Sequence, residues 1–248
     1  MSGLTEDYRR TEIRTPDPIL SGLDAWVYNV EGKYRRRTTQ TAKLLAAAEE
    51  IDAAAPLWKD KTDGALRASL VDFREVFRRN RPGFEEQLPS AMAAIREVAD
   101  RRLGLRSHLV QLAGALALYR GTVVEMATGE GKTLTAGLIA VVWGWIGRPC
   151  HIVTVNDYLA DRDARWLEPL FKFCGVSVGR VTGEMDPQAR REEYRSDVTY
   201  TTSKEILADF LRDRLRLDTL QNANRRQIQA LSGRLQDMER GLVMRGIH

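Results

Sequence analysis

Met126-Ala-Thr-Gly-Glu-Gly-Lys-Thr133 follows the run Thr122–Glu125 and precedes the apolar run Leu134–Ile146. A β-branched segment, a glycine-rich loop and an apolar helix-forming segment in this order are typical of a phosphate-binding loop. Gly129 and Gly131 carry no Cβ, so the backbone there can curl and turn its N–H groups toward a phosphate chain. We therefore predict that this stretch binds a nucleoside triphosphate.

The polar groups of the loop have separate expected roles. Lys132 supplies a positive charge for the outer phosphates, and the Thr133 hydroxyl is suited to Mg²⁺. The helix that follows presents its positive end to the anion. The full pattern G-x-x-x-x-G-K-[ST] fails at its first position, Met126, so a chance surface turn is the alternative, but the flanking segments favour the loop. The expected binding set of the loop is Thr128, Gly129, Glu130, Gly131, Lys132 and Thr133.

The composition is that of an ordinary globular chain. Of the 248 residues, 43% are hydrophobic and 29% are charged, and the formal net charge is +4. This mild positive charge permits an anionic partner, such as an acidic membrane surface or nucleic acid, without requiring one. The two cysteines form no C-x-x-C pair, which favours a reducing cytoplasmic setting. The longest apolar run, 13 residues, is too short to span a bilayer.

Strand-like and helix-like segments alternate in the second part of the chain. The strands that we expect cover 122–126, 151–155, 176–181 and 198–202. This alternation predicts an α/β fold with a parallel sheet flanked by helices and the phosphate loop at the carboxyl end of its strand. The predicted organisation is a helical N-terminal region over 1–103, a partial nucleotide-binding domain over 104–248, and a long C-terminal helix over 214–243.

Several segments resemble one family of phosphate-loop proteins. Met126–Ala136 is similar to the first nucleotide motif of SecA, the ATP-driven motor of bacterial preprotein export. Val153-Thr-Val-Asn-Asp-Tyr-Leu-Ala-Asp-Arg-Asp-Ala164 resembles the segment that follows this motif in the family, and Asp197–Glu205 and Asp209–Asp213 continue the likeness. The resemblance covers roughly residues 84–213, which contain these segments.

The resemblance implies a RecA-like fold and a set of ligands and partners. These are ATP or ADP with Mg²⁺, a preprotein, and a SecYEG-like membrane channel, with a cytoplasmic, peripheral location at the inner face of the cell membrane. The family also places a glutamine upstream of the loop to contact adenine, and Gln111 occupies that place. An amide can pair with both the donor and the acceptor edge of adenine.

The chain departs from the family pattern in two ways. Ser203-Lys204-Glu205 stands where many members have Asn-Asn-Glu, which is typical of a divergent branch. The sequence also ends at His248, before the strand that in the family carries an Asp-Glu-x-Asp motif for Mg²⁺ and the attacking water. We therefore expect an incomplete sheet, weak nucleotide binding and little or no ATP turnover by this chain alone.

Two other functions remain open at this point. A helicase fragment of superfamily 2 would have a similar Thr-Gly-x-Gly-Lys-Thr loop, and a non-catalytic binding module would lack the acidic motif. The Thr154–Ala160 segment favours the translocation motor over the helicase, and we expect no nucleic-acid partner. Salt-dependent binding of single-stranded nucleic acid would reverse that preference.

Overall fold

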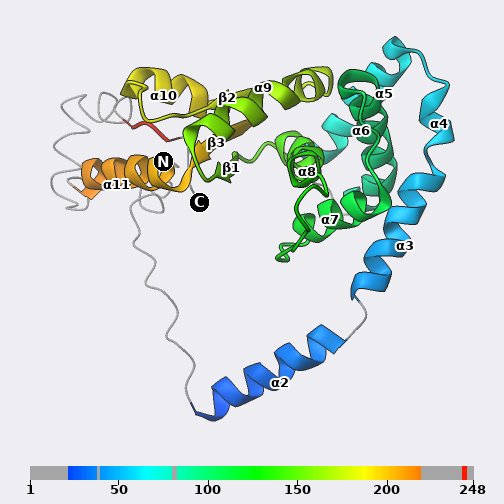
Figure 1. Ribbon diagram of the computed structural model, residues 1–248, viewed down its shortest axis with the longest axis horizontal. Helices are drawn as coiled ribbons and strands as arrows, with labels where there is room; N and C mark the ends of the chain where they lie inside the picture. The colour runs from blue at the N-terminus through cyan, green and yellow to red at the C-terminus, as the bar shows by residue number, and fades with distance from the viewer. Residues whose placement is uncertain (1–21, 38–39, 80–82, 219–241, 245–248) are drawn as a thin grey trace, which may run out of the picture.

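The computed structural model describes residues 22–37, 40–79, 83–218 and 242–244, in which helices predominate (Figure 1). Within this part of the chain, a three-stranded parallel sheet has the order β1-β3-β2. The strands are β1 (Cys150–Thr154), β2 (Val178–Arg180) and β3 (Val198–Thr202). A small parallel sheet among helices is the incomplete α/β, RecA-like arrangement that the sequence predicts.

Helices cover both faces of this sheet. The helices are α8 (Lys132–Ile146), α9 (Asp157–Phe173), α10 (Pro187–Tyr194) and α11 (Ser203–Asp218). Side chains alternate between the faces along β3. Tyr200 therefore joins the main hydrophobic cluster with residues of α8 and α9, whereas the Thr199 hydroxyl donates to the carbonyl of Glu193 in α10. The five residues of β3 are all buried, because this strand lies between the other two.

The N-terminal helices pack on α8 and α9 through the same hydrophobic cluster. They are α3 (Gln40–Ala53), α4 (Pro56–Lys59), α5 (Asp63–Arg79), α6 (Leu88–Leu103) and α7 (Leu109–Tyr119), and the 3₁₀ turn η1 (Phe84–Gln87) precedes α6. Phe73 and Phe77 of α5 contact the buried Trp145 ring of α8. Helix α2 (Leu23–Arg37) lies apart from the other helices (Figure 1).

Two glycines hold α8 close to its neighbours. A Cβ on Gly137 would meet the Leu167 side chain of α9 at 2.7 Å, and a Cβ on Gly144 would meet Val176 at 2.8 Å. Both distances are below those that packed atoms adopt, so only glycine permits this approach. The helix that follows the phosphate loop is thereby fixed against the rest of the fold.

The strand expected over residues 122–126 is not formed. These residues are described, and they have no assigned strand. A strand needs a neighbouring chain to accept and donate its backbone hydrogen bonds, and β1 is an edge of the sheet in the described residues. The other three expected strands are present within a few residues of their expected bounds.

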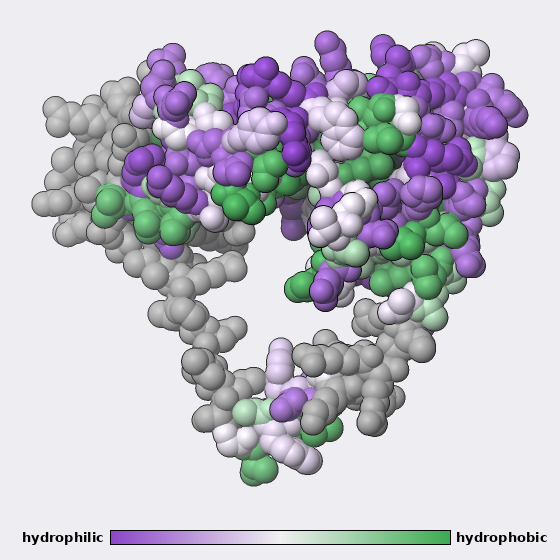
Figure 2. All heavy atoms as spheres, viewed as in Figure 1, coloured by the Kyte–Doolittle hydropathy of each residue, from purple (hydrophilic) through white to green (hydrophobic). Residues whose placement is uncertain are grey.

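Helix α11 buries acidic side chains and exposes leucines, which is the opposite of an ordinary surface helix. Glu205, Asp209 and Asp213, spaced four residues apart, are buried, whereas three leucines on the same helix are 51–72% exposed. These leucines are Leu207, Leu211 and Leu215, and Figure 2 shows hydrophobic side chains gathered along this helix. Most of the helix expected over 214–243 lies outside the described residues, and residues 242 and 243 are not helical.

In the described part of the chain, no helix has the length and apolar character needed to cross a bilayer.

Candidate nucleotide site

The phosphate loop leads directly into α8 with two residues in the left-handed region. Gly129 has φ +89° and Gly131, the residue before α8, has φ +78°. Residues 127–130 are exposed, so the loop can be reached from solvent. The first N–H groups of an α-helix have no carbonyl partner within the helix, and the helix dipole adds partial positive charge there. The start of α8 therefore offers N–H donors to an anion.

Lys132 folds back over the loop. Its Nζ donates to the carbonyl oxygen of Ala127 at 2.8 Å, although the side chain is exposed. A carbonyl is a weaker partner for an ammonium group than a phosphate oxygen, because a charged acceptor roughly doubles the strength of a hydrogen bond. Thr133 follows in the first turn of α8 and is half-buried. Lys132 can thus exchange its partner when an anion arrives.

Gln111 lies against the loop, although 19 residues separate it from Glu130. Its Oε1 accepts from the backbone N–H of His108 at 2.9 Å, and its Nε2 donates to the carbonyl oxygen of Glu130 at 2.9 Å. The first bond belongs to the capping box that starts α7. The structure therefore brings together Gln111 and the whole expected loop set, Thr128 to Thr133.

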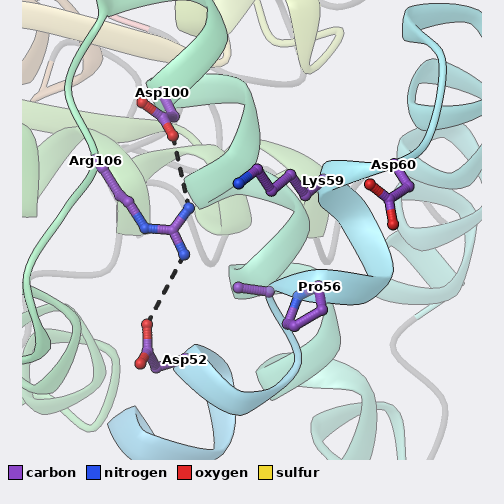
Figure 3. A pocket seen from close by; sticks show the side chains of 7 residues that line it. Asp52, Pro56, Lys59, Asp60, Asp100 and Arg106 are labelled. Carbon is purple, nitrogen blue, oxygen red and sulfur yellow. Dashed lines mark ion pairs between the residues drawn. The ribbon is translucent and has the colours of Figure 1, made fainter.

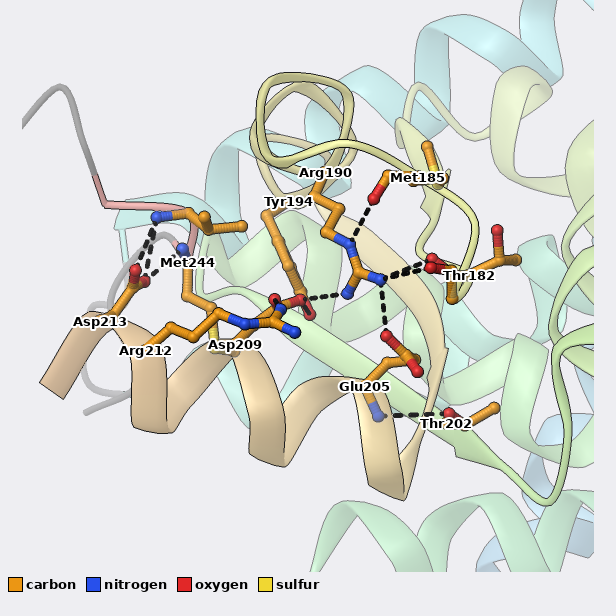
Figure 4. Close-up of polar contacts among 12 residues, drawn as sticks. Thr182, Met185, Arg190, Tyr194, Thr202, Glu205, Asp209, Arg212, Asp213 and Met244 are labelled. Carbon is orange, nitrogen blue, oxygen red and sulfur yellow. Dashed lines mark hydrogen bonds and ion pairs between the residues drawn. The ribbon is translucent and has the colours of Figure 1, made fainter. Parts of the chain in front are cut away.

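A second polar group, which the sequence did not predict, is centred on Arg190. The Arg190 cluster comprises Arg190, Tyr194, Glu205 and Asp209 (Figure 4). The guanidinium donates to Glu205 at 2.6 Å and to Asp209 at 2.9 Å, and the Tyr194 hydroxyl donates to Asp209 at 3.0 Å. Further donations from Arg190 go to the carbonyl oxygens of Met185, Thr182 and Gly183.

Burial and the neighbouring carboxylates determine the pKa values of Tyr194 and Arg190. Burial and the neighbouring Asp209 carboxylate raise the pKa of Tyr194, so its hydroxyl stays protonated and donates. Burial alone would lower the pKa of Arg190, but hydrogen bonds to Glu205 and Asp209 outweigh it and raise that pKa. The cluster is thus a set of paired charges with a structural role.

Two further carboxylates, those of Asp157 and Asp213, bond to backbone groups. The Asp157 carboxylate accepts from the backbone N–H of Gly183 at 2.7 Å. Asp213 accepts from the backbone N–H groups of Val243 and Met244, which fastens residues 242–244 to α11. Within the described residues, no group of three or more His, Cys, Asp or Glu side chains could hold a metal ion.

A surface pocket of about 540 Å³ lies between α3, α4 and α6 (Figure 3). Arg106 reaches into it and pairs with Asp100 at 3.6 Å and with Asp52 at 4.0 Å. A hydrogen bond from Arg96 lowers the pKa of Asp52. Lys59 and Asp60 also line the pocket.

The thiols are poor nucleophiles. Burial raises the pKa of Cys150 to about 11 and raises the pKa of Cys174 further. Because the thiolate is the reactive form, both side chains behave as small apolar residues at neutral pH.

Residues 30–237, which include Gln111, the phosphate loop and the Arg190 cluster, match the family model of the SecA DEAD-like domain. The chain belongs to the SecA family. It is 45% identical over 221 residues to the protein translocase subunit SecA 2 of Chlorobium chlorochromatii, a match that covers 89% of the chain and 33% of that relative. It is 37% identical over 241 residues to the protein translocase subunit SecA 2 of Magnetococcus marinus, with 96% and 37% covered.

A third SecA relative covers a smaller part of the chain. The match to the protein translocase subunit SecA of Caldicellulosiruptor saccharolyticus has 42% identity over 184 residues, 74% of this chain and 21% of that protein. This SecA-family chain thus spans a third or slightly more of the length of its SecA 2 relatives.

Proposed function

We propose that this chain is the ATP-binding part of a SecA-like motor that drives preprotein translocation across the bacterial cytoplasmic membrane. The observation that carries the proposal is the loop geometry: two left-handed glycines precede a 15-residue helix, with Lys132 and Gln111 both bonded to the loop. This arrangement has the parts that recognise a nucleoside triphosphate.

Each site residue has a proposed role. The backbone N–H groups from Gly129 to Lys132 hold the phosphates. For this, the Glu130 N–H and the Lys132 ammonium leave the Ala127 carbonyl, and the ammonium neutralises the outer phosphates. The Thr133 hydroxyl is the proposed Mg²⁺ ligand. Gln111 contacts the adenine through the amide hydrogen and the lone pair that its two protein partners leave available.

The proposed partners are a preprotein and a SecYEG-like channel, at the inner face of the cell membrane. The names of the relatives, protein translocase subunits, support this assignment. Helix α2 adds support for contact with an acidic membrane surface, because Leu23, Trp26, Val27 and Val30 recur at helical spacing and are 47–81% exposed. The sequence Arg35-Arg36-Arg37 ends this helix, and basic residues are attracted to anionic lipids.

The test is isothermal titration calorimetry of the purified chain with ATP and Mg²⁺. The expected result is saturable binding that Lys132→Ala weakens by roughly tenfold or more, since a charge-assisted bond to phosphate is lost. Lys172→Ala, at an exposed lysine near the end of α9, is the matched control and is expected to bind as the wild type does.

Absence of ATP and ADP binding by the wild type would contradict the proposal. Salt-dependent binding of single-stranded RNA without nucleotide binding at the loop would instead favour the helicase function.

A further inference from the structure

We propose that Gln111 is a positioning residue for the phosphate loop, in addition to its proposed contact with the nucleotide base; this inference rests on the function proposed above. Its Nε2 donates to the Glu130 carbonyl oxygen at 2.9 Å, and its side chain is largely buried beneath the loop. The bond joins the first turn of α7 to a loop that is otherwise exposed.

The orientation of the Gln111 amide follows from its partners. The backbone N of His108 can only donate, so it faces Oε1, and the carbonyl of Glu130 can only accept, so it faces Nε2. One hydrogen on Nε2 and one lone pair on Oε1 remain. The same amide can therefore hold the loop and contact a base.

The absence of a Cβ at Gly131 leaves space for the Gln111 side chain. A Cβ on Gly131 would collide with Nε2 of Gln111 and lie 3.3 Å from its Cδ. The left-handed φ of Gly131 favours glycine, and a side chain at this position would displace the Gln111 amide. The glycine thus allows Gln111 to reach the carbonyl one residue before it.

The consequence for the ligand follows from the planarity of the peptide bond. In a trans peptide the C=O and the N–H point in opposite directions. When Gln111 draws the Glu130 carbonyl toward α7, the N–H of Gly131 must point away from α7, across the loop. Gln111 therefore sets the direction of the Gly131 N–H, which the proposed site uses for phosphate. This effect does not depend on which base the nucleotide carries.

The deciding experiment compares three ligands: ATP, GTP and inorganic tripolyphosphate, each with Mg²⁺. The variants are Gln111→Leu, which is neutral and loses both hydrogen bonds, and Gln111→Glu, which keeps the acceptor for His108 but has no donor for Glu130. Both are expected to weaken tripolyphosphate by roughly tenfold, and ATP by at least as much because ATP also loses the base contact. Gln188→Leu, at an exposed glutamine of α10, is the control.

A second measurement needs no ligand. In the free protein, the ¹⁵N order parameter of the Gly131 amide is expected to fall in Gln111→Leu and to stay unchanged in Gln188→Leu. Circular dichroism and thermal melting confirm that each variant is folded.

The outcomes separate the two proposals. If the wild type binds none of the three ligands, the proposed function fails, and the Gly131 order parameter alone decides whether Gln111 holds the loop. If Gln111→Leu weakens ATP but spares tripolyphosphate, Gln111 contacts only the base and the positioning role is wrong. If only Gln111→Glu weakens the ligands, the added negative charge is the cause and the positioning role is again wrong.

Discussion

Lys132 in the phosphate loop is exposed and donates to the carbonyl of Ala127, whereas Arg190 is 4% exposed and donates to two carboxylates and to backbone carbonyls. In water, Lys132 can exchange one partner for another at little cost. Arg190 cannot, because breaking its pairs would leave charges buried without partners.

The difference shows that the Arg190 cluster holds the fold together, whereas the phosphate loop is free to bind a ligand. The Arg190 cluster joins the loop at 182–185, α10 and α11, so its bonds fix the position of α11 relative to the sheet. The phosphate loop is anchored at one side by Gln111 and by the glycine contacts of α8, and residues 127–130 remain exposed to solvent. We expect substitutions in the cluster to change folding and substitutions in the loop to change binding.

The largest expected effect is that of Arg190→Met. This change keeps much of the side-chain volume but leaves Glu205 and Asp209 buried without their cation, which costs about 3–5 kcal/mol. Urea unfolding of the two proteins measures the loss. The control is Arg79→Met, which breaks an exposed pair with Glu75 and is expected to cost about 0–1 kcal/mol. Equal losses for the two variants would show that the Arg190 cluster contributes no more than a surface pair.

The sequence predicted the loop because its signal is local. Eight consecutive residues specify the turn, and the apolar run after them specifies α8. Gln111 was found only through the family resemblance, since no local rule links it to residue 130. The prediction of a strand at 122–126 was wrong. A strand forms only where another segment of the chain pairs with it, and the residues of one segment do not show whether such a partner lies beside it.

The Arg190 cluster was missed for a related reason. Arg190 stands in the run Arg190-Arg191-Glu192-Glu193, which has the composition of a solvated helix face. It is buried because its guanidinium reaches from α10 to two carboxylates of α11 and to carbonyls of residues 182–185. One signal was available: Glu205, Asp209 and Asp213 recur every four residues, so one face of α11 is acidic and needs a cationic partner if buried.

A smaller effect is expected from Gly179→Ala, next to the cluster. A Cβ at this position of β2 would collide with the Glu193 backbone carbonyl and lie 2.8 Å from both the Glu193 carboxylate and the Ser196 hydroxyl. Such overpacking costs about 1–3 kcal/mol.

The matched control for this change is Gly64→Ala in α5, where a Cβ would meet nothing closer than 4.0 Å. Alanine there is expected to stabilise the helix by up to about 1 kcal/mol. Opposite signs in thermal unfolding would confirm that close packing, and not glycine as such, decides the outcome at Gly179; a loss at both positions would contradict it.

The smallest expected change in the free energy of unfolding is that of Lys132→Ala without ligand, within about 0.5 kcal/mol, because the side chain is exposed and its acceptor can bind water instead. Added nucleotide should then stabilise the wild type more than it stabilises Lys132→Ala. A ligand at 100 times its Kd stabilises a protein by about 2.7 kcal/mol, and a tenfold weaker ligand at the same concentration by about 1.4 kcal/mol. The melting temperatures of wild type and Lys132→Ala should therefore agree without ATP and diverge with it. A variant that is already destabilised without ATP would mean that Lys132 supports the fold as Arg190 does, and the contrast between the two regions would fail.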